Sequence, residues 1–332
     1  MKRSRCCLFF AIFLVSSIGA LYGQGMESTP TTPFKPALLV IDIQNCYLPM
    51  MDQKEVTPAL EAINTLIQVF RQNNYPVFAV YHHEIDQDPA PGSEAFAFPK
   101  TVGITDDDPS VIKNYPSAFQ KTELDKMLKS RGVNALYLCG LSATGCVLAT
   151  YFGALEREYD VVMVRDAVMS PKADYTDMIK NITGAWKLSF ARVGVNLLAG
   201  EMKVLQTMST KHLVSRYGIS SAADWNAMGY HLIFKNRLAD AIAVFKANAR
   251  LYPDEANCFD SLGDALERNG QKDLALANYE KAFLKAKEKN DPNLPIFEKN
   301  YKRLQEEGKR VGSNAGWCAD PQCKMIRNNL VQ

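Results

Sequence analysis

Short apolar runs alternate with longer helical patterns between about residues 36 and 200. The runs are almost continuously apolar, which is typical of parallel strands buried on both faces. The segments between them repeat apolar residues every three or four positions, as amphipathic helices do. This order predicts an α/β fold of three layers, α/β/α, with a six-stranded parallel sheet. The expected strands cover residues 37–42, 76–82, 111–113, 134–140, 160–166 and 190–195, and the expected helices cover residues 56–72, 121–131, 144–158, 174–187 and 197–207.

A different pattern begins near residue 222, where similar residues recur at a fixed spacing along the chain. Gly229 corresponds to Gly263 and Ala241 to Ala275 at this spacing. The spacing is 34 residues (263 − 229). A constant period of 34 residues indicates helix-turn-helix repeats, in which small residues let two helices approach closely. The segment resembles the tetratricopeptide repeat and predicts an all-α domain capped by a last helix at about 295–307. The matching positions are Trp225, Gly229, Ala241, Phe245 and Pro253 in the first copy and Leu262, Gly263, Ala275 and Ala282 in the second.

The N-terminal segment 1–25 has the pattern of a secretory signal peptide. Lys2, Arg3 and Arg5 precede an apolar stretch over residues 8–21, which is shorter than the roughly 20 residues that a membrane span needs. We therefore expect an exported protein, periplasmic or secreted, with no membrane attachment after cleavage. The expected organisation is a signal peptide over 1–25, the α/β domain over 36–205, a linker over 206–221, the repeats over 222–310 and a tail over 311–332. In the tail, Cys318 and Cys323 could close a disulfide loop.

Composition and charge narrow the function classes. The chain is 47% hydrophobic and 22% charged, which is typical of a globular protein. Removal of the signal peptide, with its three basic residues, changes the net charge from +2 to −1 (2 − 3), so no basic field for nucleic acid remains. Only four histidines are present, which argues against a His-rich metal cage. We expect no metal and no cofactor.

Three candidate groups stand where predicted strands end. Cys146 follows a strand and a turn and begins a predicted helix, where unpaired N–H groups favour a thiolate and can bind an oxyanion. Asp42 and Lys113 close two other strands. Taken singly, the cysteine could be a small buried residue, the aspartate a cap and the lysine a solvated side chain. Because parallel strands end at one edge of a sheet, the three groups can converge on one cleft.

Three segments resemble the isochorismatase-like cysteine hydrolases: residues 39–45 with Asp42, residues 113–122 with Lys113, and residues 140–147 with Cys146. The resemblance covers about residues 36–200 and implies a catalytic triad of these three residues. It also implies a non-proline cis peptide bond between Leu141 and Ser142, beside the nucleophile. The N–H groups of Ser142 or Ala143, together with that of Cys146, would form the oxyanion hole.

The resemblance also bears on the substrate. Relatives that cleave a vinyl ether lack the cysteine, so Cys146 favours hydrolysis of a C–N bond in a small amide or urea through a thioester. Nicotinamidases carry an acidic residue after the Gln-Asn pair and an Asp-x-His metal motif, whereas this chain has Cys46 and the sequence Asp52-Gln53-Lys54. A metal-independent enzyme with another substrate is therefore expected. We expect Gln44, Cys46, His82 and Phe119 to line the pocket, with His82 and His83 on opposite faces of their strand.

Two function hypotheses from different classes follow. The first is an exported cysteine hydrolase whose repeats bind a protein or peptide partner or mediate self-association into a homo-oligomer. The second is a tetratricopeptide interaction protein in which the hydrolase-like domain is an inactive platform. The presence of Asp42, Lys113 and Cys146 together favours the enzyme, because an inactive platform would be free to lose each of them independently.

Overall fold

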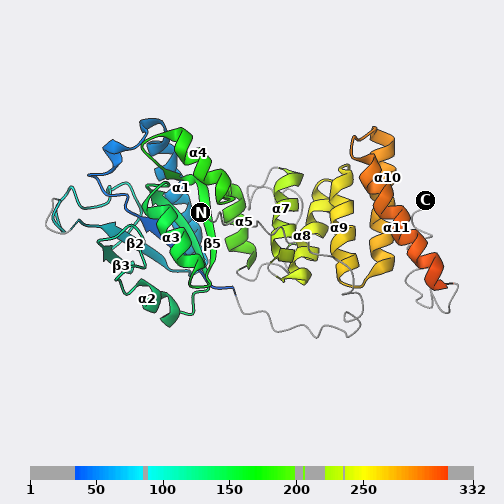
Figure 1. Ribbon diagram of the computed structural model, residues 1–332, viewed down its shortest axis with the longest axis horizontal. Coiled ribbons are helices and arrows are strands. Elements are labelled where there is room, and N and C mark those ends of the chain that lie inside the picture. Colours follow the sequence, from blue (N-terminus) through cyan, green and yellow to red (C-terminus); the bar gives the residue numbers. More distant parts are fainter. Residues whose placement is uncertain (1–33, 85–88, 199–204, 206–220, 235, 313–332) are drawn as a thin grey trace, which may run out of the picture. The chain divides into compact units, whose positions relative to one another are not determined.

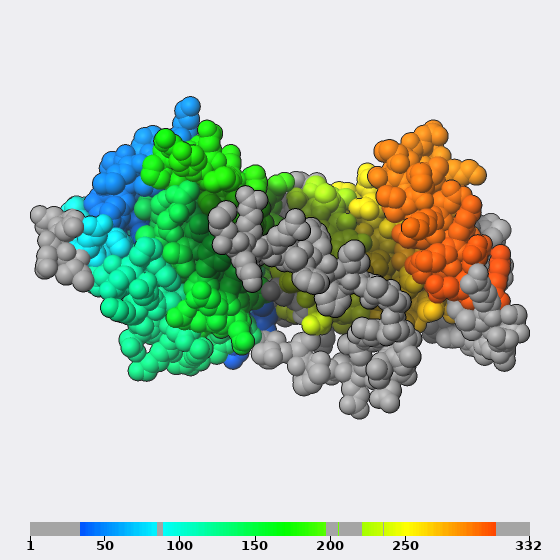
Figure 2. Space-filling view, in the orientation of Figure 1, coloured from blue at the N-terminus to red at the C-terminus, as the bar shows by residue number. Residues whose placement is uncertain are grey.

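The computed structural model describes residues 34–84, 89–198, 205, 221–234 and 236–312. The expected signal peptide, nearly all of the expected linker and the Cys318–Cys323 pair lie outside these residues. Figure 2 shows the surface of the α/β region from blue to green and that of the following helices from yellow-green to orange.

The α/β region contains one sheet of five parallel strands in the order β3-β2-β1-β4-β5. The chain adds strands on one side of β1 and then returns to add strands on the other side. Figure 1 shows β2 and β3 to the left of β5. The point where this direction reverses lies between β1 and β4, which is where α/β sheets bind ligands. The strands are β1 (Pro36–Ile41), β2 (Val77–His82), β3 (Ser110–Lys113), β4 (Ala135–Leu141) and β5 (Asp160–Met169).

Alternating side chains of the central strand enter two separate cores. Leu38 and Val40 of β1 pack with α1 and α5 on one face of the sheet, whereas Leu39 and Ile41 pack with α2 and α3 on the other. Every residue of β1 is buried, so the expectation of strands covered on both faces is confirmed for this strand. The covering elements are α1 (Gln53–Gln72), α2 (Leu124–Ser130), α3 (Cys146–Leu155), α4 (Ala173–Ile182) and α5 (Leu188–Leu198), with a 3₁₀ turn at Leu48–Met50.

The expected sixth strand over residues 190–195 is wrong, because these residues belong to helix α5. The backbone N–H of Leu188 donates to Asp166 at 2.6 Å, which satisfies one free donor at the start of this helix. Where a sixth strand would pair with β5, the described residues form a single isolated bridge between Val164 and Trp186.

Helix α5 is buried against two cores. Ala191 and Val195 pack in the core beneath the sheet, while Phe190 and Val193 pack in the core of the helices that follow. Its polar residues Ser189, Arg192 and Asn196 recur every three or four positions, as on one face of a helix, and this period argues against a strand over residues 190–195.

The described residues after 220 are helical, as expected for the C-terminal region. Buried side chains from successive helices form one core that includes Trp225, Phe245, Leu262 and Tyr279. Among the described residues, no helix is both long enough and apolar enough to span a membrane. The helices are α7 (Ala222–Phe234), α8 (Leu238–Leu251), α9 (Ala256–Arg268), α10 (Lys272–Lys289) and α11 (Leu294–Gly312).

Candidate active site

The site forms where β1 and β4 end next to each other. Asp42 follows β1 directly and has a φ of 57°, which turns the chain out of the sheet at once. Aspartate tolerates this left-handed conformation better than most residues. Gly140 lies beside Ile41 with a φ of 114°, and a Cβ atom there would collide with the Ile41 backbone. Glycine is therefore required where the end of β4 pairs with the end of β1.

Asp42 and Lys113 form a buried ion pair. Lys113 Nζ lies 2.7 Å from Asp42 Oδ2, and the side chains are 0% and 2% exposed. Lys113 ends β3, so its long side chain reaches past β2 to the end of β1. Burial raises the pKa of the Asp42 carboxyl to about 6, although the positive charge of Lys113 opposes this shift. A carboxylate of this kind is suited to accept a proton near neutral pH.

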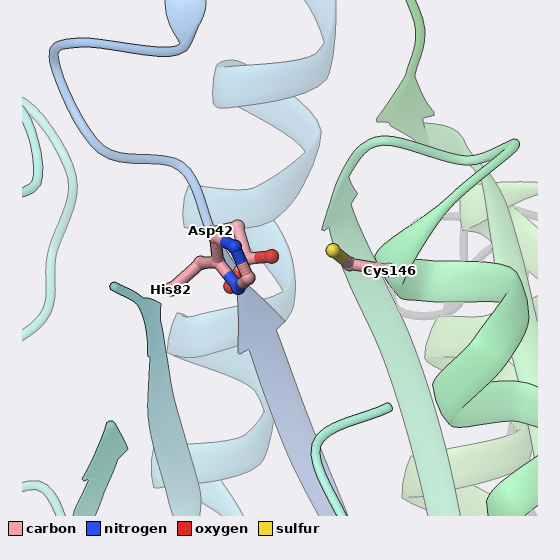
Figure 3. Close-up of side chains that lie close together, drawn as sticks. All are labelled: Asp42, His82 and Cys146. Atoms are coloured by element: carbon pink, nitrogen blue, oxygen red, sulfur yellow. The ribbon is translucent and has the colours of Figure 1, made fainter. Parts of the chain in front are cut away.

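The thiol of Cys146 faces the carboxylate of Asp42. The carboxylate and the sulfur point toward each other, from the end of β1 and from the first turn of α3 (Figure 3). Asp42 Oδ1 is buried and has no hydrogen-bond partner among the described residues. A ligand atom of each of Asp42, His82 and Cys146 lies within 4.8 Å of the others. The geometry therefore places a proton acceptor beside a proton donor.

The helix N-terminus is expected to favour a thiolate at Cys146, whereas the other surroundings of this residue favour the protonated thiol. Burial, followed by the negative charge of Asp42, raises the pKa of the Cys146 thiol to about 12. These two effects outweigh the favourable charge of Lys113. The thiol is therefore protonated at neutral pH, and it must lose its proton to a base during attack.

The turn between β4 and α3 presents backbone N–H groups beside the thiol. The peptide bond between Leu141 and Ser142 is cis. The N–H of Ala143 donates to Met169 O at 2.8 Å, so Ala143 is not available for the expected oxyanion hole. Among the described residues, the N–H groups of Ser142 and Cys146 have no hydrogen-bond acceptor. Of the alternatives that the sequence leaves open, Ser142 with Cys146 agrees with this geometry.

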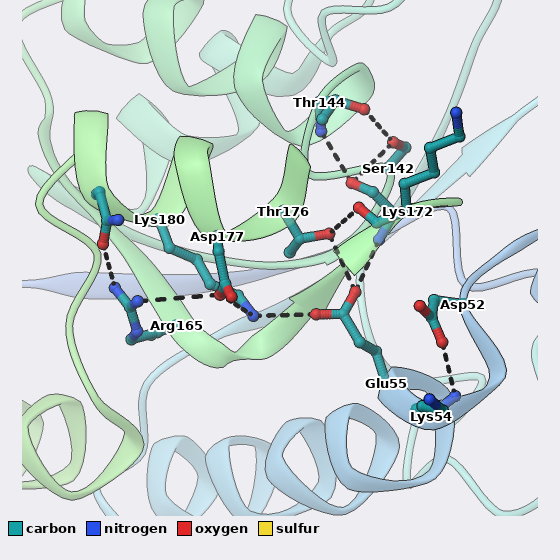
Figure 4. Close-up of polar contacts among 12 residues, drawn as sticks. Asp52, Lys54, Glu55, Ser142, Thr144, Arg165, Lys172, Thr176, Asp177 and Lys180 are labelled. Carbon is teal, nitrogen blue, oxygen red and sulfur yellow. Dashed lines mark hydrogen bonds and ion pairs between the residues drawn. The ribbon is translucent and has the colours of Figure 1, made fainter. Parts of the chain in front are cut away.

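A network of hydrogen bonds and ion pairs connects this turn to β5, α1 and α4 (Figure 4). The hydroxyl of Ser170, at the end of β5, accepts from the N–H of Thr144 at 3.2 Å and contacts the Ser142 hydroxyl at 3.3 Å. Glu55 of α1 in turn accepts from the N–H of Ser170 and pairs with Lys180 of α4 at 3.1 Å. These contacts join the turn to two helices and restrict its motion. Neither Glu55 nor Ser170 was singled out from the sequence, because neither stands in a recognisable motif.

The residues expected to line the pocket have different environments. Gln44 is 0% exposed and its amide bonds the main chain of His82, so it is structural. Cys46 is half-buried, and burial and then Asp42 raise its thiol pKa. His82 lies beside the ion pair, whereas the His83 ring packs against Phe96. Phe119 is 5% exposed, and its ring stacks on that of Tyr159.

Tyr47 is a site residue that the sequence alone did not indicate. Its ring centroid lies 6.2 Å from that of His82. Burial raises the pKa of its phenol to about 12, with further contributions from Cys46, Asp42, Glu84 and Cys146. The phenol is therefore a neutral donor near the carboxylate and the thiol. Its position shortly after Asp42 in the chain is the signal that could have indicated it.

Asp42, His82 and Cys146 also have ligand types and spacing that suit a metal ion such as zinc. The ammonium of Lys113, however, contacts two of these three residues, at 2.7 Å from Asp42 and 3.0 Å from His82. A divalent cation at this point would be repelled by a fixed positive charge in a buried environment. The three residues are therefore better explained as the polar surroundings of the ion pair.

Comparison with known proteins gives the family. The isochorismatase domain matches residues 36–192. The isochorismatase family protein YddQ of Bacillus subtilis is 32% identical over 148 residues, which are 43% of this chain and 82% of YddQ. The chain belongs to the isochorismatase family of hydrolases. Its isochorismatase domain thus contains the parallel sheet and all the site residues described above.

The names of two further relatives state an activity or a location. Maleamate amidohydrolase of Pseudomonas putida is 28% identical over 159 residues, which are 42% of this chain and 75% of that enzyme. The secreted isochorismatase effector Isc1 of Verticillium dahliae is 26% identical over 166 residues, which are 47% of this chain and 85% of the effector. Both matches cover most of the relative and under half of this chain.

Proposed function

We propose that this protein is an exported cysteine hydrolase that cleaves a C–N bond of a small amide or urea through a thioester, with Asp42, Lys113 and Cys146 as its triad. One observation carries the proposal. Asp42 binds Lys113 through Oδ2 at 2.7 Å, its Oδ1 is buried with no described hydrogen-bond partner, and its carboxylate faces the Cys146 thiol. This arrangement supports transfer of the thiol proton to the carboxylate.

In the first half of the reaction, Asp42 removes the proton from Cys146 as the sulfur attacks the substrate carbonyl carbon. The carbonyl π electrons move to oxygen, and the N–H groups of Ser142 and Cys146 stabilise the resulting oxyanion. Collapse of this intermediate breaks the C–N bond. The protonated Asp42 then gives its proton to the leaving nitrogen, so an amine or ammonia leaves and a thioester remains.

In the second half, a water molecule attacks the thioester carbonyl while Asp42 accepts one of its protons. The C–S bond breaks, the acid product leaves, and Asp42 returns the proton to the sulfur. Lys113 remains an ammonium throughout and offsets the negative charge that develops near the buried carboxylate. The cycle consumes one water for each C–N bond.

Two observations support a C–N bond as the target. A thiol suits the formation of an acyl intermediate, and maleamate amidohydrolase is among the relatives. The positive charge of Lys113 beside the candidate metal ligands supports a mechanism that needs no metal or cofactor.

The test is a panel of small amides and ureas, with ammonia or amine release as the measurement. We expect wild type to hydrolyse a member of the panel and to accumulate an acylated Cys146 detectable by mass spectrometry. Cys146→Ala should be inactive with an unchanged circular dichroism spectrum. Cys258→Ala is the control, because Cys258 is buried in the core of the C-terminal helices. A fully active Cys146→Ala protein would overturn the proposal.

Export is proposed on the N-terminal pattern of basic and apolar residues and on the name of the secreted relative. Fractionation of producing cells, with the mature N-terminus read by mass spectrometry, tests it. The exported protein is expected to lack the signal segment and to begin near position 26.

We also propose that the C-terminal helices are tetratricopeptide repeats for partner binding or self-association. Support comes from two equivalent contacts, one in each copy of the repeat. A Cβ atom on Gly229 would collide with the Phe245 ring, and one on Gly263 would lie 2.7 Å from the Tyr279 ring. Each glycine thus permits close approach of two paired helices. Analytical ultracentrifugation of the whole chain distinguishes a homo-oligomer from a monomer that is free to bind a partner.

The alternative, an interaction protein with an inactive platform, makes a different prediction for Cys146. In that case iodoacetamide should not react with this residue faster than with other half-buried cysteines, and no member of the panel should be cleaved.

A further inference from the structure

The ammonium of Lys113 has a second side-chain contact besides Asp42. His82 Nδ1 lies 3.0 Å from Lys113 Nζ, and Lys113 is fully buried. His82 and Lys113 are register partners at the ends of β2 and β3. Directly paired residues on neighbouring strands project to the same face of a sheet. The contact therefore follows from the sheet itself and does not depend on a loop.

The chemistry of the two groups fixes the direction of this hydrogen bond. An ammonium can only donate, so Nδ1 of His82 must accept and cannot carry a proton. The neutral ring then has its proton on Nε2. Burial, Lys113 and His83 together lower the pKa of His82 to about 4, which agrees with a neutral ring at physiological pH.

The main chain of His82 is held in place by Gln44. The side-chain oxygen of Gln44 accepts from the N–H of His82 at 2.7 Å, and its nitrogen donates to the carbonyl of His82 at 3.0 Å. Gln44 follows closely after Asp42 and is fully buried. One rigid connection therefore runs from the end of β1 through Gln44 and His82 to the Lys113 ammonium.

We propose that His82 is a positioning residue of the active site, which holds the Lys113 ammonium against Asp42 by accepting a hydrogen bond at Nδ1. This inference rests on the proposed function, because it assigns a role within the triad. A buried ammonium that loses an acceptor is less well held, and Asp42 then loses part of the attraction that favours its charged form. Removal of the imidazole should therefore raise the pKa of the base.

Titratable groups near the His82 ring come from several neighbouring elements. They are Lys113 on β3, His83 just after β2, Asp42 after β1, Tyr47 in the following loop and Cys146 at the start of α3. Of these, Lys113 is the group within hydrogen-bonding distance of Nδ1. A change at His82 should thus act on the triad chiefly through Lys113.

The chain offers a matched control in the adjacent histidine. The ring of His83 packs against Phe96 with centroids 6.1 Å apart. The backbone N–H of His83 donates to Lys113 O, and a leucine at this position would keep that hydrogen bond. His82→Leu and His83→Leu therefore remove the same side chain at adjacent positions, one beside Lys113 and the other beside Phe96. His82→Gln is the conservative variant, because its amide oxygen can still accept a hydrogen bond.

The first measurement is the rate of Cys146 alkylation by iodoacetamide and, with a cleaved substrate, kcat/KM, each as a function of pH. For wild type we expect activity to rise with pH to a plateau above about 6, where Asp42 is ionised. In His82→Leu, the rise in activity should occur at a pH higher by about 0.5–1 unit, and the activity at the plateau should be roughly 10- to 100-fold lower. His82→Gln should recover part of both changes, and His83→Leu should resemble wild type.

The second measurement does not require any variant to fold. NMR of ¹⁵N-labelled histidine in wild type should show one ring of the four in a fixed Nε2–H form that does not titrate between pH 5 and 8. A His82 ring that titrates near 6.5, or a His82→Leu profile equal to that of His83→Leu, would overturn the positioning role. If that happens while Cys146→Ala is inactive, the hydrolase proposal stands. An active Cys146→Ala protein would remove both.

Discussion

The Asp42–Lys113 and Glu55–Lys180 pairs lie in the same domain, and each joins a carboxylate to an ammonium. Glu55 uses both oxygens: one contacts Lys180 at 3.1 Å, and the other accepts from Thr176 and from the N–H of Ser170. Asp42 uses one oxygen for Lys113 and leaves the other buried and unpaired among the described residues. A fully bonded carboxylate fixes structure, whereas a half-bonded one retains the capacity to accept a proton.

The largest effect should come from removing the base while keeping its shape. Asp42→Asn should lower kcat/KM by about 10²- to 10⁴-fold, because an amide cannot take the thiol proton. The matched variant Glu55→Gln makes the same chemical change in the other pair and should retain activity within about tenfold. Steady-state kinetics on one substrate checks both. Equal losses in the two variants would contradict the contrast between the pairs.

The pH dependence of stability should separate wild type from Asp42→Asn. In the native protein the Asp42 carboxyl ionises only near pH 6, whereas in the unfolded chain it ionises near the ordinary pKa of 3.8. Between these values the native state binds more protons, so this group lowers the free energy of unfolding as pH rises. The effect is of the order of 3 kcal/mol by pH 7. Urea denaturation at pH 4 to 7 measures it, and parallel curves for the two proteins would refute it.

Loss of the second pair should affect stability more than chemistry. Glu55→Gln should lower the free energy of unfolding by about 1–3 kcal/mol, because Lys180, at 11% exposure, loses a charged partner. The measurement is urea denaturation at pH 7. Lys126→Met serves as a control. The side chains of Lys126 and its partner Glu123 are 84% and 72% exposed, so this ion pair should contribute little to stability.

The smallest expected effect concerns the support of the turn. Ser170→Ala removes the acceptor of the Thr144 N–H and should cost about 1 kcal/mol of stability. A few-fold decrease in kcat with little change in KM should accompany it, because the oxyanion donors would be less well oriented. Thr176→Val, which removes a hydroxyl from the same network farther from the turn, should leave kcat closer to wild type.

The sequence predicted most of the sheet because each strand is encoded locally. Continuous apolar runs located β1, β2 and β4 to within a residue or two at each end, and the short run before Lys113 located β3. The same reasoning failed for α5, because the apolar residues between 190 and 195 suit a buried strand although Ser189, Arg192 and Asn196 recur at helical spacing. Short buried segments therefore need both periods compared over their whole length.

The candidate site was only partly accessible from the sequence. Asp42, Lys113 and Cys146 could be proposed because parallel strands end at one edge. The protonation state of Cys146, the use of the Ala143 N–H by Met169 and the burial of Phe119 depend on contacts between distant segments. The same holds for the Glu55–Ser170 network, whose members are far apart in the chain. Such contacts leave no periodic signal in the sequence.

Helix α5 has a consequence for how this protein can be divided. Its Ala191 and Val195 pack in the core beneath the sheet, and its Phe190 and Val193 pack in the core of the C-terminal helices. Cutting the gene just after the family match at residue 192 would truncate this shared helix and expose apolar surface on both fragments. The α/β domain and the C-terminal helices should therefore unfold in one cooperative transition. A fusion of either part to another protein would need to include the whole of α5.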